Sequence, residues 1–251
     1  MSDRQSHPLE LLCRKLATHH PLSRQDEAAV LALPYKLRTM EAQSYLVREG
    51  DRPEICAVLI AGYAFRHKLT GDGARQIVSL HIPGEALDFQ NLFLAEADHN
   101  VQMLTRGQVA EVHMADMEKL ALGPAGLGQA ILIANLVEAS IFREWTLNIG
   151  RRDSRSRIAH LLCEFAARLT AQELQEEAHF ELPMTQEQLA DATGLTPVHV
   201  NRVLKGLQAE GLIARNRRSI SFPDWRRLRE VADFNSRYLH LASGTRERLA
   251  H

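Results

Sequence analysis

Residues 185–213 read TQEQLADATGLTPVHVNRVLKGLQAEGLI, which predicts two short helices joined by a tight turn. Thr185 begins a capping box, the pattern that marks the start of the first helix. Gly194 suits the turn because glycine adopts a positive φ at no steric cost. Thr196 and Pro197 then start the second helix, since threonine caps helix N-termini and proline fits the first helical position. Two helices joined by a three-residue turn that contains glycine are typical of a helix-turn-helix.

Three core positions support this interpretation. Small Ala190 allows the two helices to approach, Gly194 makes the turn, and Val200 fills the space between the helices. A generic helical hairpin is the alternative, but such a hairpin would meet only one or two of these requirements. The coincidence of all three with the caps favours the helix-turn-helix.

A basic hairpin follows the second helix. Segments 212–214 and 219–222 are predicted to be short strands, and they flank the sequence Arg-Asn-Arg-Arg at 215–218. This is the pattern of the wing in a winged helix. Residues 196–229 hold eight basic and two acidic side chains, a net charge of +6 in a chain whose net charge is −1. An ordinary solvated surface is the alternative, but the basic charge coincides with the motif that would use it to face phosphates.

The side chains expected to reach DNA lie on the N-terminal part of the second helix and on the wing. Arg202 has the geometry for bidentate contact with guanine, and Asn201 can read adenine or bind a phosphate. Pro197 and Val198 offer only apolar contact, as with a thymine methyl group. The wing arginines should supply affinity without sequence preference. The predicted DNA-binding residues are Thr196, Pro197, Val198, His199, Asn201, Arg202, Lys205, Arg215, Arg217 and Arg218.

Composition limits the remaining possibilities. The 251 residues are 45% hydrophobic and 24% charged, so the chain can bury a core and is not a disordered tail. Residues 1–150 carry a net charge of −4 and residues 151–251 a net charge of +3, which suggests two modules with different partners. Neither a membrane-spanning run nor a secretory signal is recognisable. The three cysteines form no disulfide framework or CxxC pair, so we expect a reduced cytoplasmic location.

The first half of the chain has a different sequence pattern. After an N-terminal segment of 35 residues with helical spacing, short apolar or alternating runs separated by glycine-rich turns extend to about residue 114. Six or more such strands predict a small β-sandwich or β-roll. The runs lie at 44–47, 55–61, 63–69, 76–82, 101–105 and 108–114.

A long helix is expected from 124 to 148, because this stretch has no internal proline and repeats apolar residues at steps of three and four. We interpret the repeat as the contact between two copies of the chain; the alternative is a helix that covers its own β-roll. A second helix should cover 154–173, and polar residues 172–181 should form a connector. The predicted dimer residues are Leu127, Ala130, Ala134, Val137, Ile141 and Trp145.

The order of β-roll, long helix and winged helix-turn-helix resembles the Crp/Fnr family of bacterial transcription regulators over nearly the whole chain. Its marks are 49–51 (Glu-Gly-Asp), Gly62, 83–85 (Pro-Gly-Glu) and, most specifically, 185–213. The resemblance implies an α+β fold with a jelly-roll-like N-terminal β-roll (a double-stranded β-helix). It implies a cyclic-nucleotide-binding-like sensor domain at 1–122, a dimerisation helix at 123–150 and a DNA-binding domain at 151–251.

The recognition helix both follows and departs from the family pattern. The family carries an arginine that reads guanine at the place of Arg202, so this role is expected here. The commonest family helix has a glutamate where this chain has Val198, and a small Gly or Ser is frequent where it has Asn201. A valine cannot accept a hydrogen bond from cytosine. We therefore do not expect the usual family operator.

The effector pocket departs further. Members that bind cyclic nucleotides use a Gly-Glu pair for the ribose and an Arg-Ser pair for the cyclic phosphate. An ungapped alignment from Pro-Gly-Glu at 83–85 places Asp88 with Phe89, and His99 with Asn100, at these positions. A phosphate in the interior of a roll needs a fixed cation and donors, so we expect that cyclic AMP does not bind.

Other chemistry finds little support in the sequence. Isolated Cys13 cannot form the N-terminal cysteine cluster of the iron–sulfur branch, and no histidine has a metal-site spacing with a carboxylate. We expect no metal, haem or other cofactor, and no enzyme, since neither a nucleophile motif nor a phosphate loop is present.

The sequence thus predicts a cytoplasmic homodimer that binds double-stranded DNA at a pseudo-palindromic site. RNA polymerase is a further candidate partner, and a membrane is not. Two alternatives remain: a regulator gated by an unidentified small molecule in a rebuilt roll pocket, and a metal-dependent β-roll enzyme with a DNA-binding tail.

Overall fold

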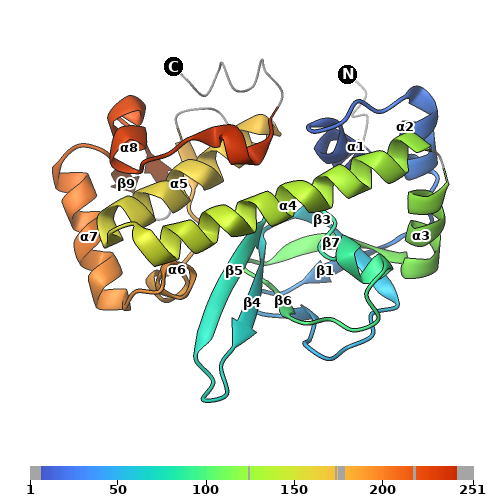
Figure 1. Ribbon diagram of the computed structural model, residues 1–251, viewed down its shortest axis with the longest axis horizontal. Helices are drawn as coiled ribbons and strands as arrows, with labels where there is room; N and C mark the ends of the chain where they lie inside the picture. The colour runs from blue at the N-terminus through green and yellow to red at the C-terminus, as the bar shows by residue number, and fades with distance from the viewer. Residues whose placement is uncertain (1–6, 124, 173, 175–178, 217–218, 242–251) are drawn as a thin grey trace. The chain divides into compact units, whose positions relative to one another are not determined.

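The computed structural model in Figure 1 describes residues 7–123, 125–172, 174, 179–216 and 219–241. The chain forms two compact units, one of residues 1–66 with 80–136 and the other of residues 67–79 with 137–251. The expected α+β class is confirmed, with a β-roll, a long helix and a C-terminal winged helix-turn-helix in that order.

Most helices and strands fall close to the predicted positions, but Lys36–Met40, Met114–Leu122 and Trp225–Val231 were not predicted. The helices are α1 (Glu10–Ala17), α2 (Arg24–Leu31), α3 (Met114–Leu122), α4 (Ala125–Arg151), α5 (Ser154–Ala171), α6 (Gln186–Thr193), α7 (Pro197–Ala209) and α8 (Trp225–Val231), with 3-10 turns η1 (Phe89–Leu92) and η2 (Ser236–Leu239). The strands are β1 (Lys36–Met40), β2 (Tyr45–Val47), β3 (Ile55–Ala61), β4 (Ala64–Leu69), β5 (Arg75–His81), β6 (Asn100–Met103), β7 (Gly107–His113), β8 (His179–Glu181), β9 (Ala214–Asn216) and β10 (Ser219–Ser221).

Two antiparallel sheets make the roll. One has the order β1-β7-β3, with Cys56 opposite Val112, and the other has the order β2-β6-β4-β5. Gly62 turns the chain between β3 and β4 with φ of +81°. A Cβ atom on Gly62 would lie 2.8 Å from the carbonyl oxygen of Arg106, so the turn excludes any larger residue.

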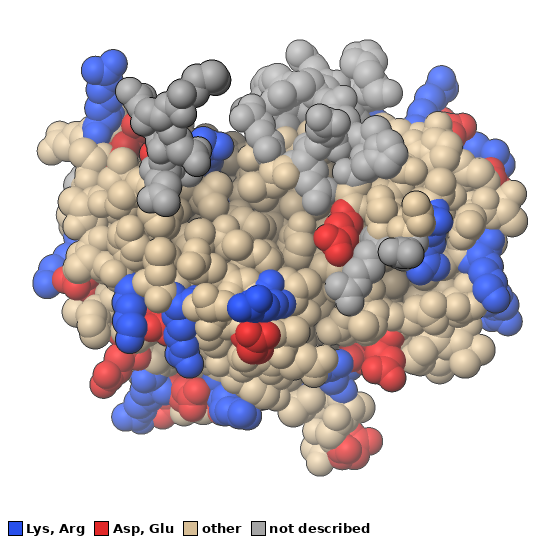
Figure 2. All heavy atoms as spheres, turned by 180° about the vertical axis from the view of Figure 1, so that it is seen from behind, with Lys and Arg blue, Asp and Glu red and all other residues tan. Residues whose placement is uncertain are grey.

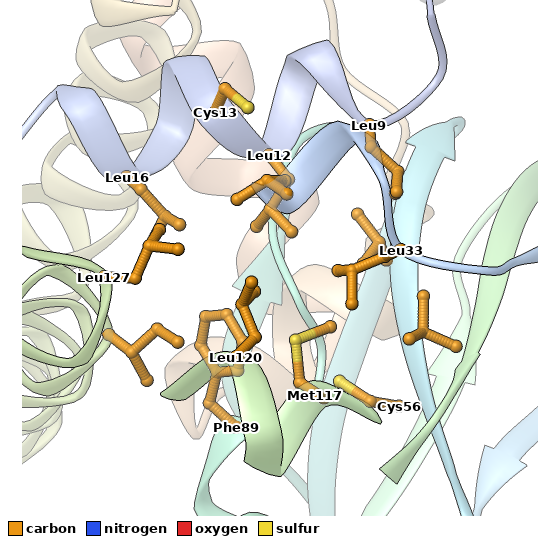
Figure 3. Packing of buried hydrophobic residues seen from close by; sticks show 14 of the residues in the cluster. Leu9, Leu12, Cys13, Leu16, Leu33, Cys56, Phe89, Met117, Leu120 and Leu127 are labelled. Carbon is orange, nitrogen blue, oxygen red and sulfur yellow. The ribbon is translucent and has the colours of Figure 1, made fainter. Parts of the chain in front are cut away.

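Apolar side chains pack on both faces of the β1-β7-β3 sheet. The interior of the roll is filled by residues such as Leu59, Val101 and Val109. On the outer face, α1, α3 and the start of α4 converge on a second apolar cluster, and Figure 3 shows Leu12 and Leu16 of α1 pointing into it. The labelled residues of that cluster are Leu9, Leu12, Cys13, Leu16, Leu33, Cys56, Phe89, Met117, Leu120 and Leu127.

The apolar stripe predicted for dimer contact is covered by the chain's own cores. Leu127 and Ala130 are fully buried in the cluster of Figure 3, and Ala134 packs against that cluster. Val137, Ile141 and Trp145 are 5–8% exposed. The alternative interpretation, a helix that covers its own β-roll, therefore describes the first part of this stripe. Helical spacing alone does not tell which of two adjacent faces packs within the chain.

A different face of α4 remains open. Leu132 and Leu136 are 59% and 58% exposed, and they lie one helical turn apart. By length and composition alone α4 is also apolar enough to cross a membrane, a test that core helices of soluble proteins pass as well. Its buried stripe packs on the cluster of Figure 3, and 33% of its most apolar stretch is buried in all.

The C-terminal unit is built around a buried carboxylate. Glu164 on α5 accepts hydrogen bonds from Trp145 Nε1 at 3.0 and 3.1 Å and from the Tyr238 hydroxyl at 2.8 Å. Arg168 lies 3.4 Å away, and burial raises the pKa of Glu164 despite this neighbour. These bonds fasten the end of α4 and η2 to α5, because breaking them would leave a buried charge without partners. Trp145, predicted at a dimer contact, thus has a role inside the chain.

All three cysteines are buried. Burial raises the pKa of Cys13 to about 11 and of Cys56 to about 12, and it raises that of Cys163 as well. Since the thiolate is the reactive form, the environment of these side chains is that of small core residues.

Candidate nucleic-acid interface

Helix α6 begins with the predicted capping box. The backbone N–H of Gln188 donates to Thr185 Oγ1 at 3.2 Å, and the backbone N–H of Thr185 donates to Gln188 Oε1 at 2.8 Å. Two N–H groups that the helix leaves without partners are thereby satisfied. Ala190 is 3% exposed where α6 meets α7, and the two helices lie side by side in Figure 1.

The turn has the predicted left-handed glycine. Gly194 has φ of 63° and ψ of 37°, and the N–H of Leu195 donates to the carbonyl of Ala190 at 3.1 Å. From α5, Arg157 donates to the carbonyl of Thr193 at 2.7 Å and to that of Arg152 at 3.0 Å. One guanidinium therefore holds the turn against the junction of α4 and α5.

Helix α7 presents one buried and one exposed face. Thr196 accepts from the backbone N–H of His199 at 3.3 Å, and Pro197 occupies the first turn as predicted. Val200 is fully buried, together with Val203, Leu204 and Leu207 of the inner stripe. The inner stripe fixes which residues can point outward.

Six of the predicted contact residues lie on the outer face of α7 or at its N-cap. Thr196, Pro197, Val198, Arg202 and Lys205 are exposed, and Asn201 is half-buried on the same outer face. Val198 is 81% exposed. These side chains are free to meet a groove of DNA.

His199 is positioned differently. Its Nε2 lies 2.8 Å from the hydroxyl of Ser154, the first residue of α5, and the side chain is half-buried. This contact ties the first turn of α7 to α5. We therefore interpret His199 as a residue that orients the helix, while its outer neighbours remain available for bases.

The wing consists of three strands. β9 and β10 pair with Asn216 opposite Ser219, and β8 adds a third strand on the other side of β10. β8 lies at the end of the stretch predicted as a connector, and its three-residue length left no period-2 pattern to recognise. Arg215 is half-buried on β9, and Arg217 and Arg218 lie outside the described residues.

Basic side chains continue beyond the wing, some with acidic neighbours. Arg226 lies 3.3 Å from Glu230 on α8, and Glu210 at the end of α7 pairs with Arg155 and lies 4.0 Å from Arg227. Figure 2 shows both signs of charge mixed over the face that it draws. Part of the positive charge of the region is therefore balanced by neighbouring carboxylates.

The four residues predicted for the effector pocket have different surroundings. Asp88 and His99 are 1% and 2% exposed, and Asp88 Oδ1 lies 3.6 Å from His99 Nε2. Asn100 accepts from the backbone N–H of Glu49 at 3.2 Å, whereas Phe89 packs in the apolar cluster of Figure 3. Two of the four residues thus form a buried pair of carboxylate and imidazole.

Three structural residues escaped the sequence analysis. Arg157 and Ser154 hold the helix-turn-helix, but surface arginines and serines are common and their partners are 36 and 45 residues away. Arg66, 3% exposed, donates to the carbonyl of Leu87 at 2.9 Å within the roll. Its position inside a predicted strand was the one available signal, because alternation assigns residue 66 to the same face as apolar Ala64.

Comparison with known proteins agrees with both halves of the chain. Residues 156–231 match a family described as "Crp-like helix-turn-helix domain", and residues 37–122 match one described as "Cyclic nucleotide-binding domain". The chain is 30% identical to "Transcriptional activator protein FnrL" of Cereibacter sphaeroides, covering 84% of this chain and 86% of that protein. It is 28% identical to "Nitrogen fixation regulation protein FixK" of Rhizobium meliloti, covering 82% and 91%.

Solved structures show the same fold. FixK2 from Bradyrhizobium japonicum superposes with a TM-score of 0.72 at 23% identity, covering 79% of this chain and 98% of that one. A regulator of Xanthomonas campestris described as c-di-GMP responsive has a TM-score of 0.61 at 18% identity, covering 80% and 99%. The order of elements is therefore shared along the length of both structures.

Proposed function

Because this chain belongs to the Crp/Fnr family of transcriptional regulators, we propose that it acts as a homodimer that reads a two-fold-symmetric operator without cyclic AMP. The observation that carries the proposal is the outer face of α7. A capped helix with an exposed N-terminal half, held by a buried inner stripe, has the geometry that enters a major groove. The domain limits of 1–122, 123–150 and 151–251 and a cytoplasmic location form part of the same proposal.

Within this face, Arg202 reads guanine. Its side chain is exposed on the second turn of α7, and a guanidinium makes two parallel hydrogen bonds to the O6 and N7 atoms of guanine. Lys205, Arg215 and the wing-tip residues Arg217 and Arg218 contact phosphates, which adds affinity without base preference.

Self-association uses the open face of α4. Leu132 and Leu136 are exposed there, and Ala125, Leu132 and Ala139 recur at steps of seven along the helix. A repeat of seven keeps this stretch of the helix directed at a partner helix. The exposed leucines form an apolar patch on a chain whose net charge is −1. A second copy of the same helix would cover this patch.

Independence from cyclic AMP rests on the interior of the roll. A cyclic phosphate is an anion and needs a fixed cation and hydrogen-bond donors. The buried Asp88 carboxylate stands at the family position next to the ribose site, and His99 replaces the arginine of the phosphate site. Neither a carboxyl group nor an imidazole supplies the permanent cation that an arginine supplies at the phosphate site.

The experiment is selection of bound sequences from a random duplex pool at near-physiological salt, with and without added cyclic AMP. We expect the same two-fold-symmetric site in both selections, with half-sites about one helical turn (~34 Å) apart. For Arg202→Ala we expect relaxed preference at one base pair per half-site and a loss of about 1–3 kcal/mol. Enrichment only with cyclic AMP, or an unchanged preference in the variant, would contradict the corresponding part of the proposal.

A further inference from the structure

Val198 is the most exposed large apolar side chain in the described part of the chain. Its exposed fraction is 81%, although it lies in the middle of the first turn of α7, between the exposed Pro197 and the half-buried His199. The inner stripe that holds α7 begins two residues later, at Val200. A smaller or polar residue at position 198 would therefore pack equally well within its own domain.

Two residues close to Val198 make contacts within the protein. The hydroxyl of Thr196 caps the helix, and the ring of His199 lies against Ser154 on α5. Val198 and Arg202 are separated by four residues and so share one face of the helix. The face that meets DNA thus presents the apolar side chains of Pro197 and Val198 beside the polar groups of Asn201, Arg202 and Lys205.

An isopropyl group neither donates nor accepts a hydrogen bond, so it cannot distinguish bases by their polar edges. In the major groove, the one apolar mark on a base is the C5 methyl group of thymine. We propose that Val198 is a specificity-determining residue that packs on a thymine methyl group in each operator half-site. This inference rests on the proposed function, since it requires α7 to lie in the major groove.

The helix also fixes where this thymine lies. Four residues of α-helix rise about 6 Å, and successive base pairs are about 3.4 Å apart. The thymine contacted by Val198 is therefore expected about two base pairs from the guanine contacted by Arg202. In the selected operator, both bases should appear in each half-site at this spacing.

The test removes the methyl group without changing any hydrogen bond. Each thymine of the selected operator is replaced by uracil in both half-sites, and the dissociation constant is measured for the wild-type protein and for Val198→Ala. Loss of one buried methyl group corresponds to about a fourfold weaker half-site, or about fifteenfold for both half-sites. We expect this loss at one thymine for the wild-type protein and less than a twofold loss at that thymine for Val198→Ala.

Leu122→Ala serves as the matched control, because Leu122, 68% exposed at the end of α3, lies outside the recognition helix. This variant should keep the full thymine-to-uracil difference. The assignment is overturned if the operator holds no thymine at this spacing, or if uracil weakens binding by Val198→Ala as much as binding by wild type. It is also overturned if Pro197→Ala, which removes the other exposed apolar side chain of the first turn, abolishes the difference while Val198→Ala keeps it. Failure to select any symmetric site would instead contradict the proposed function.

Discussion

The open face of α4 yields a quantitative prediction about assembly. Fully burying a leucine side chain stabilises by about 1.5–3 kcal/mol. Leu132 and Leu136 have a little under three fifths of their surface exposed, so a partner helix has about 0.9–1.8 kcal/mol to gain from covering each. A two-fold-symmetric dimer brings four of these leucines into the contact. The change to alanine removes only the part of each side chain beyond Cβ, so part of the buried area remains. The double variant Leu132→Ala, Leu136→Ala should therefore weaken the dimer by about 2.5–5 kcal/mol, a factor of about 10² to 10⁴.

Sedimentation equilibrium over a range of protein concentrations measures this change directly. The matched control is Leu37→Ala with Leu122→Ala, which truncates two leucines that are 41% and 68% exposed away from α4. Far-ultraviolet circular dichroism should give the same helix content for all three proteins. A dissociation constant for the Leu132 and Leu136 variant that equals that of the control would refute the assignment of this face.

Two further predictions concern DNA affinity and acid stability. Replacing both Arg217 and Arg218 by alanine should lower the affinity for all DNA duplexes by the same factor. Because the dimer then neutralises about four fewer phosphates, the slope of log K against log salt should flatten by about 3.6. A loss of affinity confined to the operator would mean that the wing reads bases. His160, buried beside Tyr238 and the carbonyl of Ala232, has its pKa lowered to about 4, first by burial and then by the Arg152 charge. The unfolded chain therefore binds more protons than the folded one between pH 6.5 and 4, so the free energy of unfolding should fall by about 2 kcal/mol from pH 7 to pH 5. Denaturant unfolding followed by the fluorescence of Trp145 and Trp225, both in the same unit as His160, measures it, and His160→Gln should lose this part of the pH dependence.

The helix-turn-helix was predictable because its signals are local. The cap of Thr185, the left-handed Gly194 and the proline start of α7 are each imposed by backbone geometry within a few residues, and the structure has all three. The strands of the roll were also predictable, since alternation between turns is a short-range pattern. β8 was missed because three residues carry too little pattern.

Contacts between distant segments were not predictable. The ring of His199 meets Ser154, which lies 45 residues earlier, and no local pattern in the sequence predicts this contact. Phe89 and Asp88 are adjacent in sequence, yet one packs among leucines and the other beside His99. Neighbouring residues of a chain point in different directions once the backbone turns, so adjacency predicts no shared pocket.

The sequence by itself determined the class of fold, the two helices of the DNA-binding motif and the face of α7 that stays exposed, because each depends on caps, turns and short periods. Only the tertiary structure decided which face of α4 is open. Apolar residues recur along this helix at more than one set of helical positions, and spacing is identical for a stripe that faces the chain's own core and one that faces a partner. Burial of Leu127 and exposure of Leu136 distinguish the two, since burial depends on which distant segments fold against each face.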